Sequence, residues 1–185
     1  MATQPMPIVL IVEQSRIEQA KARKVVIDSG FSAVVASTYQ DGLRILENLD
    51  PLNGQRIAGV MTGIYLPERD SHEPALEPRG LGMILRAARR ATPIPAAVCA
   101  DLNLPACGYL LVTLLALDSF AQLTTAPIKT EGAFGGKDWV KVFNSLDLGM
   151  RSRLASDQNT LLIVSDFSKN GFDENIASYG DQLGF

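Results

Sequence analysis

The chain has 185 residues, of which 46% are hydrophobic and 20% are charged, and its formal net charge is −3 at pH 7. This length and composition suit one globular domain that buries a core without needing disulfides or metals. No basic run exceeds a pair such as Arg89-Arg90, which argues against a nucleic-acid-binding protein.

The N-terminal stretch carries no positive charge before residue 16, and its apolar run, residues 8–12, is too short for a signal peptide or a membrane span. The two cysteines, Cys99 and Cys107, lie in apolar surroundings, which favours reduced core thiols over a disulfide. We therefore expect a soluble, cytoplasmic protein.

The first third of the chain alternates between strand and helix patterns. Apolar runs rich in β-branched residues predict strands at residues 8–12, 31–37 and 57–63. The first helix is predicted to begin at a capping box formed by Ser15 and Glu18, and the second to begin at Thr38. Gly42, near the start of the second helix, weakens that helix slightly.

The alternation continues after a polar loop at residues 68–79. Further strands are predicted at residues 96–100, ending at Asp101, and at residues 128–134. Further helices are predicted at residues 80–91, 105–121 and 138–146, the last capped by Asp138. Five strands alternating with five helices predict an α/β fold: a doubly wound, five-stranded parallel sheet with the flavodoxin-like order 2-1-3-4-5.

The pattern changes after residue 146. We therefore expect one domain over residues 6–146 and a C-terminal extension over residues 147–185. Within the extension, residues 160–165 form another strand-like run. That run could pair with an edge of the sheet, with another molecule, or with nothing.

The order of the elements and the residues between them resemble the receiver domain of two-component response regulators (CheY-like) over residues 6–146. The resemblance is carried by residues 8–16, the Gly30-Phe31 turn, residues 61–67 and 94–100, and Gly136-Lys137. The stretch Gly-Gly-Lys-Asp-Trp at residues 135–139 also resembles that of bacterial receiver-like proteins.

Receivers hold Mg²⁺ with two acids, accept a phosphoryl group on an Asp, and read it with a Ser or Thr and a Lys. Carried over to this chain, the acid pair becomes Glu13 and Gln14, and the phosphoacceptor position is Gly63. The Ser/Thr position is Ala100, and the Lys is Lys137. The resemblance therefore implies no catalytic residue, no metal site and no cofactor, and it leaves Glu13, Gln14 and Lys137 as a vestigial binding pocket.

Two arrangements of this pocket are open. Glu13 and Lys137 could form an ion pair across it, or they could bind an anion or another small ligand. Neighbouring Thr62 should point away from the pocket because side chains alternate along a strand.

We expect a phosphorylation-independent pseudo-receiver that acts in signalling through protein–protein contacts and is not an enzyme. In receivers the output surface is built from the fourth helix, the fifth strand and the fifth helix, here residues 104–146, and these two helices could support a homodimer. The alternative is a small-ligand-binding protein or enzyme that uses Glu13, Asp101 and Lys137. A third possibility is a degenerate receiver that retains only the fold.

Overall fold

The computed structural model describes residues 6–48, 56–69, 77–90, 92–101, 128–133 and 137–169. The chain divides into two units, residues 1–150 and residues 151–185. The predicted helix at residues 105–121, Cys107 and the Gly135-Gly136 pair lie outside the described residues. Among the helices of the described ranges, none combines the length and the apolar character that crossing a membrane requires.

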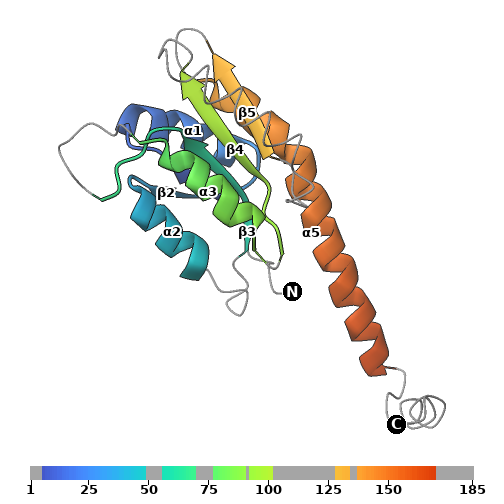
Figure 1. Cartoon of the computed structure of the whole chain (residues 1–185). Coiled ribbons are helices and arrows are strands. Elements are labelled where there is room, and N and C mark those ends of the chain that lie inside the picture. Colours follow the sequence, from blue (N-terminus) through green and yellow to red (C-terminus); the bar gives the residue numbers. More distant parts are fainter. Residues whose placement is uncertain are drawn as a thin grey trace, which may run out of the picture. The chain divides into compact units, whose positions relative to one another are not determined.

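A parallel sheet lies at the centre of the first unit, and its strand order is β2-β1-β3-β4-β5 (Figure 1). The strands are β1 (Ile8–Val12), β2 (Ser32–Ala36), β3 (Ile57–Gly63), β4 (Ala96–Asp101) and β5 (Ile128–Ala133). In the register of the sheet, Val12 lies opposite Ala36 on one side and Thr62 on the other. The carboxyl ends of β1 and β3 therefore meet at one edge of the sheet. The α/β fold with a parallel sheet that the sequence predicts is confirmed.

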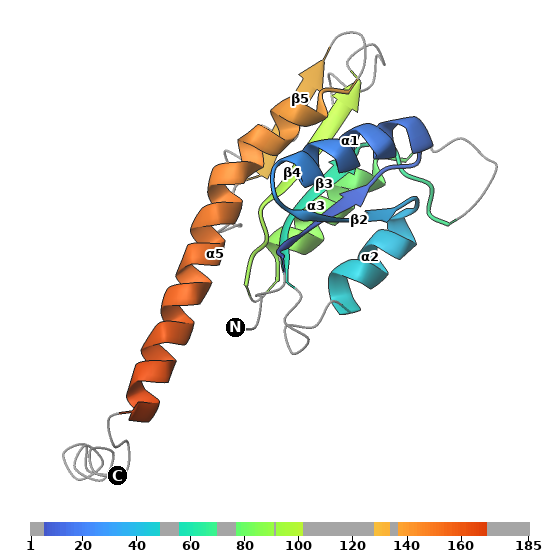
Figure 2. The ribbon, with the colours of Figure 1, turned by 180° about the vertical axis from the view of Figure 1, so that it is seen from behind.

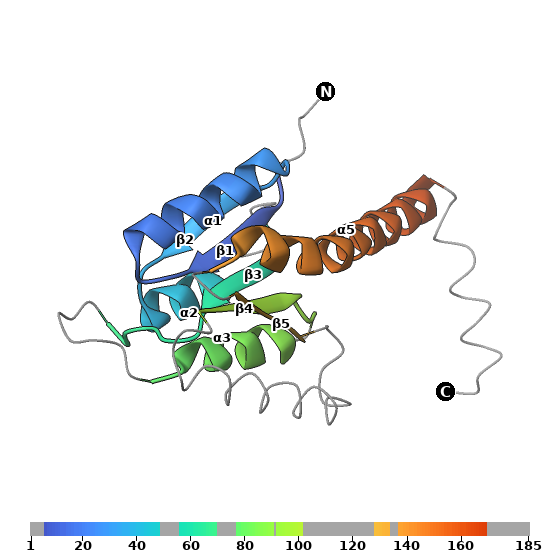
Figure 3. The same ribbon diagram turned by 90° about the horizontal axis from the view of Figure 1, so that it is seen from above.

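Helices α2 (Tyr39–Asn48) and α3 (Arg79–Ala88) lie together on one face of the sheet (Figure 3). Their apolar side chains and those of the strands form one buried cluster, which includes Leu10, Val12, Leu46, Val60, Met83, Ile84 and Ala87. Burying each large member of such a cluster stabilises the fold by about 1.5–3 kcal/mol. Gly42 has a packing role here, because a Cβ at this position would lie 2.9 Å from a methyl group of Val12.

Helix α1 (Arg16–Asp28) and the beginning of α5 (Trp139–Lys169) lie on the opposite face of the sheet (Figures 2 and 3). Among the described side chains of α5, the buried apolar ones have helical spacing and are Trp139, Val142, Phe143, Leu146 and Met150. The Phe143 ring packs edge-to-face against Phe31, with 5.6 Å between ring centroids. Gly59 of β3 leaves the space that the Met150 sulfur fills.

The cap of α1 differs in part from the predicted capping box. Ser15 Oγ accepts a hydrogen bond from the Glu18 backbone N–H at 3.5 Å, as the box requires. The Ser15 backbone N–H donates to Glu13 Oε1 at 2.9 Å, whereas the box predicts Glu18 as its partner. The prediction for Glu18 is therefore wrong, because a nearer carboxylate takes that donor and Glu18 binds other groups.

The other two predicted caps are confirmed. Thr38 Oγ1 accepts from the Asp41 backbone N–H at 3.1 Å, and Asp138 Oδ1 accepts from the Lys141 backbone N–H at 3.0 Å. Each bond satisfies an N–H that would otherwise lack a partner in the first turn of the helix.

The observed extent of α5 corrects the secondary structure predicted for the residues after Leu146. The helix does not end at Leu146 but continues to Lys169, so residues 160–165 are helical and not a strand. The division between the two units falls after Met150, within the range of this helix. A six-residue apolar run cannot by itself distinguish a strand from a helix. Once a helix exists, each added residue gains a hydrogen bond without a new nucleation step, which favours continuation through this run.

Candidate functional site

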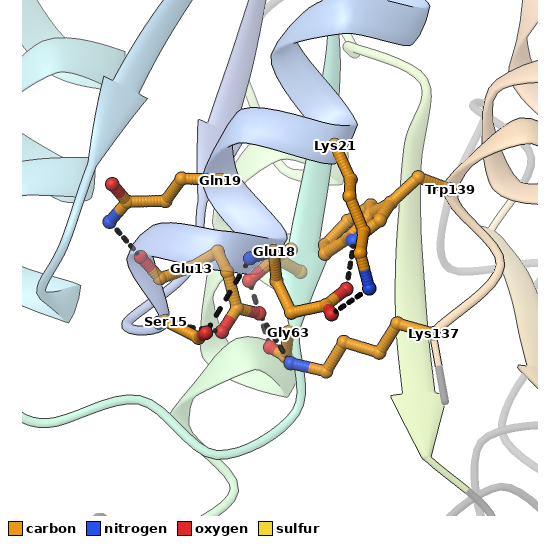
Figure 4. Close-up of polar contacts among 9 residues, drawn as sticks. Glu13, Ser15, Glu18, Gln19, Lys21, Gly63, Lys137 and Trp139 are labelled. Carbon is orange, nitrogen blue, oxygen red and sulfur yellow. Dashed lines mark hydrogen bonds and ion pairs between the residues drawn. The ribbon is translucent and has the colours of Figure 1, made fainter. Parts of the chain in front are cut away.

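The candidate site lies where β1 and β3 end, and Glu13 is its central residue (Figure 4). The Glu13 backbone N–H donates to the Ala36 carbonyl at 3.0 Å, which extends the pairing of β1 with β2 by one residue. The Gln19 side chain donates to the Glu13 carbonyl at 2.5 Å. These backbone contacts fix Glu13 at the sheet edge, and its side chain is only 1% exposed.

Lys137 lies across the site and forms an ion pair with Glu13 Oε2 (Figure 4). Since Ser15 binds Oε1, both oxygens of the Glu13 carboxylate have a partner. The Lys137 side chain is 18% exposed, and its Nζ lies 5.8 Å from the centroid of the Trp139 ring. Of the two arrangements left open by the sequence, the structure shows the ion pair.

Gly63, the last residue of β3, faces this ion pair. A Cβ at residue 63 would lie 2.5 Å from Glu13 Oε2 and 3.1 Å from Lys137 Nζ. Real Cβ atoms essentially never approach another atom as closely as the first of these distances. The ion pair therefore occupies the space in which any side chain at residue 63 would begin.

The first turn of α3 closes the site from another side. The Gly80 backbone N–H donates to the Ile64 carbonyl at 2.9 Å, and a Cβ on Gly80 would overlap the Gly63 carbonyl oxygen. Thr62 is fully buried, and its hydroxyl donates to the same Gly63 carbonyl at 2.9 Å. The hydroxyl of Thr62 is therefore committed to the backbone and is no substitute for the missing nucleophile.

A second set of polar contacts joins α1 to the start of α5. The Trp139 indole N–H donates to Glu18 Oε2 at 2.8 Å, and Lys21 contacts Glu18 Oε1 at 2.6 Å. Burial raises the pKa of Glu18, but hydrogen bonds from Lys21 and Trp139 and the charges of Lys21 and Lys137 outweigh it, so the net pKa is lowered. Glu18 is therefore held in its charged form.

The Glu18 contact was missed by sequence reasoning, which assigned Glu18 to the capping box. The available signal was the position of Trp139, two residues after Lys137, which places the indole near the pocket. A buried indole N–H usually finds an acceptor, so a carboxylate from the facing helix was the group to look for.

The remaining predicted site residues are Gln14, Ala100 and Asp101. Gln14, which the resemblance places beside Glu13 in the pocket, is exposed, and its role there stays a prediction. Ala100 and Asp101 lie at the end of β4, where their backbones pair with Gly132 and Ala133. Their side chains lie outside what the structure describes, so the role predicted for Asp101 stays a prediction.

Cys99 lies on β4 and is buried as a free thiol. Burial raises the pKa of Cys99 to about 12, against the opposing effect of the Lys137 charge. Only the thiolate is a good nucleophile, so this thiol is unreactive in the folded protein. The core position predicted for Cys99 is confirmed.

The residues present do not fit the magnesium site that the resemblance would supply. Mg²⁺ takes oxygen ligands in near-octahedral geometry. The Glu13 carboxylate already binds Lys137 and Ser15, and Gln14 is exposed. Across the described ranges, no three His, Cys, Asp or Glu residues come together in a way that could hold a metal ion.

No protein-family model matches the sequence, and no curated protein matches it either. Solved structures do match the fold. A response regulator receiver domain protein (CheY-like) from Methanospirillum hungatei superimposes with a TM-score of 0.54 at 12% identity, over 82% of this chain and 99% of its own. A response regulator receiver domain protein from Clostridium thermocellum gives a TM-score of 0.52 at 14% identity, over 85% of this chain and 99% of its own.

The same fold also occurs in a neighbour with a different title. The structure titled adenylate cyclase from Rhodopirellula baltica gives a TM-score of 0.55 at 11% identity, over 84% of this chain and 96% of its own. At these identities the likeness concerns the fold, and activity must be argued from the site. The chain has the fold of response-regulator receiver domains.

Proposed function

We propose that this chain is a pseudo-receiver: a receiver-fold module that works without phosphorylation and regulates signalling through contacts with other proteins. The observation that carries the proposal is the ion pair between Glu13 and Lys137 in front of Gly63. A phosphoryl-accepting receiver needs a carboxylate nucleophile at the end of β3, and glycine offers no side chain there.

The charges of the site support the same proposal. In a working receiver the acid helps to hold Mg²⁺ and the lysine pairs with the phosphoryl group, so both must be available to ligands. Here each satisfies the other, and Glu13 is almost completely buried. Separating the pair would leave a buried carboxylate without its counter-ion, at a free-energy cost of about 3–5 kcal/mol. A ligand that draws Lys137 away has to supply that energy.

The arrangement of the secondary structure is consistent with the doubly wound sheet expected for a receiver. The strand order β2-β1-β3-β4-β5, with α1 and α5 on one face and α2 and α3 on the other, supports this arrangement (Figure 3). Ligand and partner sites of such sheets lie at the carboxyl ends of the strands, where Glu13 and Gly63 are found.

The proposed partner is a protein, and α5 is the described element that supports a contact. Val140 and Leu148 of α5 are 55% and 81% exposed. Large apolar side chains in such positions are covered when helices associate. A homodimer through this helix is the form we propose to test, by comparing the mass in solution of the wild-type chain with that of a Val140→Ser/Leu148→Ser variant. A smaller mass for the variant supports the dimer.

The proposal is tested with Trp139, whose indole lies beside Lys137 and Glu18. We would titrate Mg²⁺ into the protein, add beryllofluoride as a mimic of a phosphoryl group, and follow the fluorescence of Trp139. No change is expected, provided that the signal responds to denaturant. A saturable change would contradict the proposal and would favour the alternative, a small-ligand site or enzyme that uses Glu13, Asp101 and Lys137.

A chemical test addresses phosphorylation directly. Incubation with acetyl phosphate and Mg²⁺, followed by intact-mass spectrometry, should leave the mass of the chain unchanged. An added phosphoryl group that is lost at alkaline pH, as an acyl phosphate is, would show that some other carboxylate accepts it.

A further inference from the structure

A second charged region lies away from the Glu13–Lys137 pair, in a groove lined by residues of α2 and α3. These two helices are neighbours in Figure 1. The groove has a volume of about 500 Å³ and is lined by Tyr39, Leu46, Glu47, Gly82, Leu85, Arg86, Arg89 and Arg90. This volume falls within the usual range for small-molecule sites. Three positive charges within five residues stand out in a chain whose net charge is −3.

Among the described residues, two of the three arginines make no side-chain interaction that stabilises the fold. Arg90 donates to the Leu46 carbonyl at 2.7 Å and thereby binds the last turn of α2. Arg86 and Arg89 are exposed, and in the part of the chain that the structure describes neither has an ion pair. Like charges this close repel each other, so an anion placed between them would lower the energy of the region.

The opposite end of the groove is aromatic. The hydroxyl of Tyr39 lies close to the bare backbone of Gly82, where a Cβ would come within 2.9 Å of the phenol oxygen. Because residue 82 is glycine, the half-buried Tyr39 ring can lie against α3. Among the described residues the Tyr39 hydroxyl has no hydrogen-bond partner, so it is available to a ligand.

The two ends are far enough apart for one extended molecule. Tyr39 and Leu46 are seven residues apart on α2, which corresponds to about 10 Å along the helix axis. Apolar contacts from Leu46 and Leu85 lie along the groove, and Glu47 offers a carboxylate that can accept hydrogen bonds from hydroxyl or amino groups. A planar ring at one end and phosphates at the other therefore match the chemistry of the groove.

We infer that the α2–α3 groove is a binding site for a nucleotide, a nucleoside diphosphate being the simplest member of the class. Arg86 and Arg89 bind the phosphate oxygens, because a guanidinium group presents paired donors that match phosphate geometry. Tyr39 contacts the base. This site does not use Glu13, Gly63 or Lys137. The inference can therefore be tested separately from the pseudo-receiver proposal, and the failure of one would leave the other intact.

A groove beside α1 offers a matched control. It has a volume of about 580 Å³, with Arg16 and Arg23 among its lining residues. Both arginines are exposed, so an Arg16→Gln/Arg23→Gln variant removes the same charge as Arg86→Gln/Arg89→Gln from a different place. The control groove has no aromatic lining residue.

The experiment is a calorimetric titration of the full chain with ADP, GDP, CDP, UDP and inorganic pyrophosphate, each at low and high salt. At least one diphosphate nucleotide should bind saturably, and more weakly at high salt. The Arg86→Gln/Arg89→Gln variant should lose at least about tenfold in affinity, while the Arg16→Gln/Arg23→Gln variant should bind as the wild type does.

Three results would overturn the inference. They are the absence of saturable binding by any of the four nucleotides, an equal loss in both double variants, and binding of pyrophosphate as tight as that of every nucleotide. Should the glutamine variant fail to fold, Arg86→Lys/Arg89→Lys keeps the charge but removes the paired donors. A loss of affinity in that variant supports the inference, and unchanged affinity contradicts it.

Discussion

Charged side chains gather both at the carboxyl edge of the sheet and in the α2–α3 groove, but the two sets differ in their pairing and in their exposure. At the edge, Glu13 and Lys137 are largely buried and paired with each other. In the groove, Arg86 and Arg89 are exposed and have no ion pair among the described residues. The place where receivers perform their chemistry is thus internally neutralised, and the unpaired charge lies elsewhere. A search for ligands should therefore follow unpaired charge and not the position at which receivers of the same fold bind theirs.

The largest expected effect comes from removing the cation at the sheet edge. Lys137→Met should destabilise the fold by about 3–5 kcal/mol, because Glu13 would remain buried without its counter-ion. Urea unfolding followed by Trp139 fluorescence measures the change.

The double variant Glu13→Gln/Lys137→Met is the control for this prediction. It removes both charges and should recover much of the lost stability, since a neutral pair needs no counter-ion. If Lys137→Met unfolds at the same urea concentration as the wild type, the ion pair does not stabilise the sheet edge. The contrast drawn between the edge and the groove would then be wrong.

Filling the space at residue 63 should have the next largest effect. Gly63→Ala places a methyl group 2.5 Å from Glu13 Oε2, so the ion pair has to move, and we expect a loss of about 1–3 kcal/mol. Thermal unfolding measures it. In a Glu13→Ala background, which lacks the carboxylate that a Cβ at residue 63 would meet, the same substitution should have a smaller effect. Equal effects in both backgrounds would show that the ion pair does not crowd Gly63.

A smaller effect is expected at Glu18, which links α1 to Trp139. Its pKa in the folded state is lowered from the ordinary value of 4.5, so its stabilising contribution is present above that value and is lost as the pH falls through the folded-state pKa. Glu18→Gln should destabilise the protein by about 1 kcal/mol at pH 7.

The pH dependence of the stability difference shows whether the charge of Glu18 causes it. The stability difference between the wild type and Glu18→Gln should shrink when unfolding is measured at pH 3. A difference that stays constant between pH 7 and pH 3 would mean that the charge of Glu18 does not contribute.

The smallest effect on stability is expected for the exposed arginines of the groove. Arg86→Gln/Arg89→Gln should change stability by no more than about 0.5 kcal/mol in the absence of ligand, because both side chains are exposed and form no ion pair with any described residue. Urea unfolding measures this as well. A loss of 2 kcal/mol or more would show that these arginines serve the fold, as Arg90 does.

Much of the fold could be predicted from the sequence because its signals are local. The strand at residues 8–12 and the strand ending at Gly63 were predicted with their observed bounds, since runs dominated by apolar residues fit strands buried on both faces. The end of α5 could not be predicted, because the residues after Leu146 are compatible with more than one secondary structure.

The sequence predicted which residues form the candidate site better than it predicted the contacts among them. The resemblance placed Glu13, Gly63 and Lys137 together, and the structure does the same. The role predicted for Gln14 stays a prediction, because the exposed position of this residue does not decide whether it lines the pocket. The Trp139–Glu18 bond joins residues 121 positions apart, and no local pattern reports such a contact.

The short approach of Gly63 to Glu13 also has a consequence for how this protein can change by mutation. An Asp introduced at residue 63 would bring a second carboxylate against Glu13 Oε2, with Lys137 as the one cation observed to pair there. An Asp at residue 63 therefore requires Glu13 to rearrange as well, and two carboxylates this close would repel each other. A mutational route to a carboxylate at the end of β3 thus needs a change at Glu13 in addition to the change at residue 63.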